Sequence, residues 1–142
     1  MKELYIFFER NPHCVDVFRD SLLAIALCQG AALHYYNKTN GIKDFDVWYF
    51  FSENGNRKFN PRWRHEADST LSKFGKHPDH SPHFLGRKLD LLGRTIPSRE
   101  GSPEECIKAY LTQKRIKSAF LLSQKAVVGL YPDNILGLVI WP

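Results

Sequence analysis

The hydrophobic positions in the first part of the chain predict two helices. Asn11 followed by Pro12 is a helix-start signal, and apolar side chains then recur at helical spacing at positions 15, 18, 22 and 25. We therefore expect one helix that begins at Asn11 and ends near Cys28. A glutamine and a glycine then turn the chain, and residues 31–37 predict a short second helix.

Two carboxylates accompany the first predicted strand. Residues 45–51 are mostly aromatic or β-branched, which favours a strand, and Asp44 and Asp46 lie at its start. Side chains two residues apart on a strand point to the same face, so these carboxylates converge. Repulsion at such a distance is relieved by a shared proton or a divalent cation. A second predicted strand carries Asp90 among leucines, where an acid needs an explanation.

Residues 57–64 alternate basic and aromatic side chains, and two interpretations stay open. Such alternation is typical of nucleic-acid binding, because the cations meet phosphates and the rings stack on bases. The interpretation that we favour is a helix that starts at Asn60 and Pro61 and leaves Arg62 and Arg64 in solvent. Its buried stripe would consist of Trp63, Ala67, Thr70, Leu71 and Phe74.

A metal-binding cluster is suggested by three histidines at three-residue steps, His77, His80 and His83. Two prolines in the same stretch oppose a helix that would bring the three rings to one face. We therefore interpret residues 75–84 as a polar loop that precedes the second acidic strand.

The clearest helix boundary lies in the second half of the chain. Ser102 and Glu105 form a Ser-x-x-Glu capping box, with a proline at the first helical position. The apolar stripe of this helix consists of Ile107, Tyr110 and Leu111. Its cations, which we expect to stay in water, are Lys108, Lys114, Arg115 and Lys117.

The remaining residues complete the prediction of the fold. Residues 118–124 can continue this helix to about Gln124, residues 126–128 predict a short strand, and residues 135–141 are apolar enough to dock on the core or on another subunit. The fold class that follows is α+β, a mixed β-sheet with helices packed against it. A chain of 142 residues with 43% hydrophobic residues is typical of one globular domain, so we expect a single domain over residues 1–142.

Three motifs occur in a definite order along residues 22–92. They are Gly30-Ala31, then after twelve residues Asp44-Phe45-Asp46, and later Leu89-Asp90-Leu91. In this order they resemble the signature of the DNA polymerase beta-like nucleotidyltransferase superfamily: Gly-Gly or Gly-Ser, an Asp-x-Asp or Asp-x-Glu strand, and a later strand with one more acid. The resemblance implies a minimal nucleotidyltransferase domain.

The resemblance also implies a reaction and the residues that perform it. A nucleotidyl group would move from a nucleoside triphosphate to an acceptor, with magnesium or manganese as the metal. Asp44 and Asp46 would hold the divalent ions that grip the triphosphate, and Asp90 would bind the ion nearer the attacking hydroxyl.

Phosphate binding would fall to the turn and to nearby cations. Gly30 and Ala31 would bring backbone amides close to the phosphates. The cations that we expect there are Lys43, Arg87 and Lys88. Small enzymes of this kind are similar to those that work with a helical protein partner, so a protein partner or a homodimer is implied as well.

The charge of the chain favours an anionic partner. The formal net charge is +5, and all of it comes from residues 71–142, where eleven basic side chains face six acidic ones. Nucleotide phosphates, nucleic acid and acidic proteins would all satisfy this charge. We expect no membrane span, because no apolar run is long enough, and no secretory signal, so we expect a cytoplasmic protein with reduced cysteines.

Two further hypotheses compete with the enzyme. One is a catalytically inactive nucleotidyltransferase-like module that binds a protein or nucleic acid through its basic second half. The other is an unrelated α+β domain in which the acids are structural, with Asp90 paired to Arg87 or Arg94.

Overall fold

The structure, a computed structural model, describes residue 9 and residues 19–38, 41–53, 58–69, 87–97 and 101–142. Its strands are β1 (Leu22–Cys28), β2 (Phe45–Ser52), β3 (His65–Ser69), β4 (Arg87–Ile96), β5 (Ala126–Tyr131) and β6 (Val139–Trp141). Its α-helices are α3 (Gln29–Asn37), α4 (Pro103–Leu111) and α5 (Lys117–Ser123), and short 3-10 helices span Arg19–Ser21 and Asp133–Ile135. The α+β class is confirmed.

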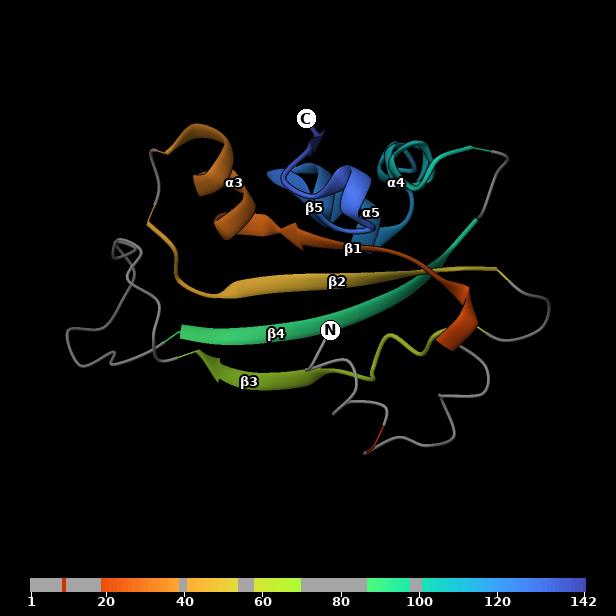
Figure 1. Cartoon of the computed structure of the whole chain (residues 1–142), viewed down its shortest axis with the longest axis horizontal. Helices are drawn as coiled ribbons and strands as arrows, with labels where there is room; N and C mark the ends of the chain where they lie inside the picture. The colour runs from red at the N-terminus through yellow and green to blue at the C-terminus, as the bar shows by residue number, and fades with distance from the viewer. Residues whose placement is uncertain (1–8, 10–18, 39–40, 54–57, 70–86, 98–100) are drawn as a thin grey trace.

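The strands form one mixed sheet in the order β3-β4-β2-β1-β5-β6 (Figure 1). Strands β2 and β4 are parallel and pair over eight residues, from Phe45 opposite Leu89 to Ser52 opposite Ile96. Strand β1 is antiparallel to both β2 and β5, and β3 is antiparallel to β4. The two predicted acidic strands are therefore direct neighbours.

Helices pack on both faces of this sheet. Helices α4 and α5 bury one face in a core to which β1, β2, β4 and β5 also contribute, with Ala26, Phe50, Ile107 and Leu122 among its members. Helix α3 lies on the opposite face at the β5 side, where Ala32 packs with Ala126 and Val128. On that second face, next to β4, Phe59 stacks on Phe51 with ring centroids 4.8 Å apart.

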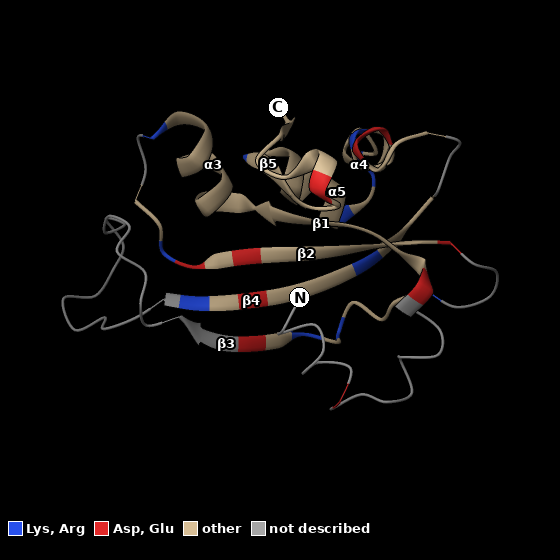
Figure 2. Ribbon diagram, in the orientation of Figure 1, with Lys and Arg blue, Asp and Glu red and all other residues tan. Residues whose placement is uncertain are grey.

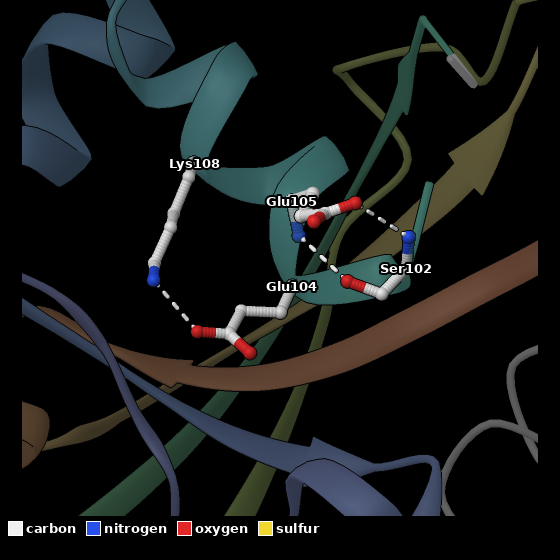
Figure 3. Close-up of polar contacts among 4 residues, drawn as sticks. All are labelled: Ser102, Glu104, Glu105 and Lys108. Atoms are coloured by element: carbon white, nitrogen blue, oxygen red, sulfur yellow. Dashed lines mark hydrogen bonds and ion pairs between the residues drawn. The ribbon is translucent and has the colours of Figure 1, made fainter. Parts of the chain in front are cut away.

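The predicted capping box of α4 is confirmed (Figure 3). The amide of Glu105 donates to Ser102 Oγ at 3.2 Å, and the amide of Ser102 donates to Glu105 Oε2 at 3.0 Å. One turn later, Lys108 Nζ lies 2.6 Å from Glu104 Oε1. The apolar stripe of α4 is buried as expected, but the helix that was expected to continue to about Gln124 is interrupted, because α4 ends at Leu111 and α5 begins at Lys117. The expected strand after Gln124 is present, and Ile140 of β6 is docked in the core.

The predicted helix from Asn11 to Cys28 is wrong over its second half, because residues 22–28 form strand β1. Ala24, Ala26 and Cys28 pack in the core under α4 and α5, and Ile25 packs in the core of the opposite face, so the sequence of this strand is apolar almost throughout. A run that is buried on both faces shows no period-2 alternation, and its leucines match a helical stripe equally well.

The predicted helix after Asn60 is also wrong, because residues 65–69 form strand β3. The Asn60-Pro61 signal makes a single turn: Asn60 Oδ1 accepts from the amide of Arg62 at 3.0 Å, and the Asn60 carbonyl accepts from the amide of Trp63 at 3.0 Å. The same contacts would start a helix, but here the chain continues along the edge of β4.

Some predictions fall outside the described residues. They are the helix start at Asn11, the stripe positions from Thr70 to Phe74, and the loop with His77, His80 and His83. None of the described helices has the length and apolar character that a membrane crossing requires.

The turn between β5 and β6 yields a test of the fold. A Cβ added at Gly129 would collide with the carbonyl oxygen of Ile135, which is backbone and cannot swing away. We expect Gly129→Ala to lower the free energy of unfolding by about 1–3 kcal/mol, measured by urea denaturation. The control is Gly30→Ala, because a Cβ at Gly30 has no atom within 4 Å. Equal stability of the two variants would contradict this packing.

Candidate functional site

The parallel pairing of β2 and β4 brings the predicted acids together. Asp46 lies directly opposite Asp90, and Glu66 of β3 lies opposite Asp90 on its other side. Asp44 is two residues before Asp46, so its side chain belongs to the same sheet face. We call Asp44, Asp46, Glu66 and Asp90 the acidic cluster. Figure 2 shows acidic positions on the three neighbouring strands β2, β4 and β3.

Asp46 is the most perturbed carboxyl of the acidic cluster. Burial raises its pKa from 3.8 to about 6, with further contributions from the negative charges of Asp90 and Asp44. Arg64 and Lys125 act in the opposite direction but do not cancel the shift. A carboxyl in such surroundings is stabilised by a proton or by a bound cation.

Asp90 forms an ion pair with Arg64, the residue directly before the edge strand β3. Arg64 Nη2 lies 3.5 Å from Asp90 Oδ2, and the Asp90 side chain is 16% exposed. Burial and the nearby Glu66 raise the pKa of Asp90, while Arg64 lowers it. The other oxygen, Oδ1, is buried and has no hydrogen-bond partner among the described residues. An unpaired buried carboxylate oxygen is a feature that a cation or a proton would relieve.

Asp44 and Lys88 are connected by a hydrogen bond where β2 and β4 begin. The backbone amide of Lys88 donates to Asp44 Oδ1 at 3.1 Å, which orients the carboxylate at the start of β2. The side chain of Lys88 is directed to Glu66, with Nζ 3.7 Å from Oε2. Lys88 of β4 therefore contacts two members of the acidic cluster, Asp44 through its backbone amide and Glu66 through its side chain.

A pocket of about 380 Å³ opens beside the acidic cluster, at the junction of β1, α3, β2 and α5. It is lined by Gln29, Gly30, Gly41, Lys43, Asp44, Asp46, Leu121 and Lys125. We call it the acidic pocket. Four of the residues predicted for the site, Gly30, Lys43, Asp44 and Asp46, thus share one pocket. Asp90 stands next to it through its pairing with Asp46, Ala31 is buried in α3, and the side chain of Arg87 is outside the described part.

The first turn of α3 offers backbone donors to this pocket. The N-cap residue, Cys28, makes no side-chain capping hydrogen bond, and the first turn contains no acidic residue. Free amides and the positive end of the helix dipole favour an anion at such a position. Gln29 has φ of 60°, a left-handed conformation that is uncommon for a residue other than glycine and that clusters at functional sites.

Gly30 has no evident structural reason to be glycine. Its φ is outside the left-handed region, and a Cβ at this position would meet no atom within 4 Å. A glycine within a helix lowers its stability by about 0.5–1 kcal/mol relative to alanine. The close approach of a ligand to the backbone would explain why glycine is present.

Sequence reasoning missed three charged residues of the site. Arg64 and Glu66 were hidden by the helix predicted after Asn60. Arg64 is exposed, as that prediction had it, but it also pairs with Asp90. Lys125 is one of two residues between α5 and β5, and no pattern along the chain marks it.

The donor set suits a divalent cation that is shared with phosphates. In the described residues, no three His, Cys, Asp or Glu side chains lie close enough to form a complete metal-binding cluster. Magnesium, however, is usually bound through one or two carboxylates together with substrate phosphates and water. Asp44 and Asp46, which line one pocket together with Gln29 and Gly30 at the start of α3, fit this second mode.

Comparison with family models, curated proteins and solved structures gave no match for this chain. The chemistry of the site must therefore be inferred from its own residues.

The raised pKa of Asp46 predicts a pH-dependent stability. Because the folded-state pKa of about 6 exceeds the ordinary value of 3.8, the folded state binds the proton more tightly. The contribution of Asp46 is therefore favourable at low pH and is lost as the pH rises through about 6. We expect Asp46→Asn to raise the thermal midpoint at neutral pH. The variant should also show a weaker pH dependence of the midpoint between pH 3.8 and about 6. The matched control is Asp133→Asn, at an exposed carboxylate outside the acidic cluster, and a lowered midpoint for Asp46→Asn would refute the shift.

Proposed function

We propose that the acidic pocket binds a nucleoside triphosphate together with a divalent cation, and that the protein transfers a nucleotidyl group to an acceptor. The observation that carries this proposal is the composition of the pocket. It combines carboxylates, which attract a metal ion, with lysines and an uncapped helix start, which attract phosphates. A metal–phosphate complex is the ligand that satisfies both sets of groups at once.

The order of the motifs supports the same proposal. Gly30 is the second residue of α3, the Asp-x-Asp pair stands at the start of the next strand, and Asp90 lies on the strand beside it. This is the order that the resemblance to the DNA polymerase beta-like nucleotidyltransferases requires. Magnesium, or manganese in its place, would neutralise charge on the triphosphate during attack of an acceptor hydroxyl and release of pyrophosphate.

The chain's own residues would position the triphosphate. Backbone amides at the start of α3 would donate to phosphate oxygens, with Gly30 leaving room for them. Lys43 and Lys125, which both line the pocket, would pair with the remaining phosphate charge. Asp44 and Asp46 would supply the oxygen ligands for the cation, and the amide of Lys88 keeps Asp44 in place.

One observation favours the inactive module as the second candidate. Arg64 already provides Asp90 with a positive charge, at 3.5 Å, so the third acid has an internal partner. In this alternative, the fold is kept and the basic second half binds a protein or nucleic-acid partner. Incubation with nucleoside triphosphates labelled at the α-phosphate, and then with cell extract as the source of acceptors, separates the two: only the enzyme incorporates label.

Metal-dependent nucleotide binding is the first test. We expect one or more of the ribonucleoside triphosphates to raise the thermal midpoint, but only with magnesium present, because a ligand that binds the folded state stabilises it. The double variant Asp44→Asn, Asp46→Asn should stay folded and lose this response. Asp133→Asn should keep it. Stabilisation that persists in the double variant, or that needs no metal, would rule out this site.

Gly30→Ala separates a ligand role from a structural one. Alanine should raise the free energy of unfolding by about 0.5–1 kcal/mol, because the helix is favoured and the added methyl group meets no neighbour. The same methyl group stands where phosphates would approach, so the triphosphate-dependent shift should weaken. Urea denaturation and the thermal shift measure the two effects. Undiminished nucleotide binding by the variant would show that the helix start does not contact the phosphates.

A further inference from the structure

A second pocket, of about 530 Å³, lies at the other end of the β2–β4 pair. It is lined by Arg94 and Thr95 of β4, by residues that directly follow β2 and β4, by Lys58 and Pro61, and by residues of α4, α5 and the connection between these helices. We call it the Arg94 pocket. Arg94 is four residues beyond Asp90 on β4, and no residue that lines the acidic pocket also lines this one. The volume is in the range of small-molecule sites, which is about 300–1,000 Å³.

Arg94 is held in place by an aromatic ring and a backbone carbonyl group. Its guanidinium carbon lies 4.8 Å from the centre of the Trp48 ring, and Nη1 donates to the carbonyl oxygen of Gly93 at 2.7 Å. Among the described residues no acid lies within ion-pair distance of it. Burial lowers the pKa of Arg94, and Tyr110 acts in the opposite direction. A guanidinium fixed in this way presents its remaining N–H groups to an anion.

The rest of the pocket suits an organic phosphate. Lys58 and Lys117 add two cations, and Glu53 is the acid among the described lining residues, so the excess is two positive charges. A phosphomonoester carries about two negative charges near pH 7. The hydroxyl groups of Tyr110 and Ser118, which hydrogen-bond to each other, add polar partners in the wall. Proline and isoleucine side chains line the remainder and would contact an apolar group.

We propose that the Arg94 pocket binds a small organic phosphomonoester, with Arg94 as the anchor of the phosphate and the apolar wall against the organic group. This site is separate from the acidic pocket and does not depend on the function proposed above.

Phenyl phosphate is a suitable probe, because it combines a phosphate dianion with a flat apolar group. We expect saturable binding by isothermal titration calorimetry, and a change in tryptophan fluorescence because Trp48 lies under Arg94. Inorganic phosphate should bind more weakly, since it makes no apolar contact. Benzyl alcohol, which lacks the charge, should not compete.

Variants assign the binding to this pocket. Arg94→Gln should lower the affinity for phenyl phosphate by about tenfold or more, as expected for the loss of a charged hydrogen bond. Lys117→Gln should lower this affinity by a smaller factor. Arg115→Gln removes an exposed cation outside the lining and should change nothing. If Arg94→Gln does not fold, Arg94→Lys takes its place, because lysine keeps the charge but lacks the paired N–H donors of the guanidinium group. This variant should also weaken binding. The double variant Asp44→Asn, Asp46→Asn should bind normally.

Three results would overturn the assignment. They are the absence of saturable binding, binding that is unchanged in Arg94→Gln or in Arg94→Lys, and binding that is lost in the double variant of the acidic pocket. The last result would place the phosphate in the acidic pocket instead.

Discussion

The parallel pairing of β2 with β4 is the constraint on which the rest of the molecule depends. These strands are neighbours in the middle of the sheet, and their register fixes which side chains of each strand stand side by side. On one face it sets Asp46 beside Asp90 at one end and Trp48 beside Leu92 further along. A shift of one residue in β2 would turn Trp48 and Phe50 away from the core under α4 and α5 and move Asp46 to the other face of the sheet, so this core enforces the register.

The acidic cluster has a cost that the core must offset. Carboxylates that lie on adjacent strands repel one another, and burial adds to the penalty, as the raised pKa values of Asp46 and Asp90 indicate. Arg64 compensates part of this repulsion from the β3 side. A protein that keeps such a cluster at the rim of its core, instead of replacing it with apolar residues, has the electrostatics of a ligand site.

The parts of the fold that sequence reasoning could predict are those with local signals. Ser102 and Glu105 predict the start of α4, because a capping box is complete within four residues. Asp44 and Asp46 can be assigned to the start of a strand, because the neighbouring residues are strong β-formers. Strand β1 could not be recognised, because its two faces are buried by residues from distant parts of the chain, those of α4 and α5 on one face and those packed with Ile25 and Leu27 on the other. For the same reason the contact of Arg64 with Asp90 was not foreseeable: it depends on β3 lying against β4.

The proximity of Asp46 and Asp90 was predicted from motif order, whereas the second pocket was not, because Arg94 looks like an ordinary surface cation in the sequence. Both sites are built on the same two hydrogen-bonded strands, and this has a consequence for spacing. Asp90 and Arg94 are separated by four residues of one strand, a length of about 13 Å that the backbone sets and that no side-chain rotation can change. The backbone of β4 therefore fixes the distance between the two sites. Substitutions can alter the chemistry at either end, but the interval between the two ends is preserved for as long as β4 remains paired with β2.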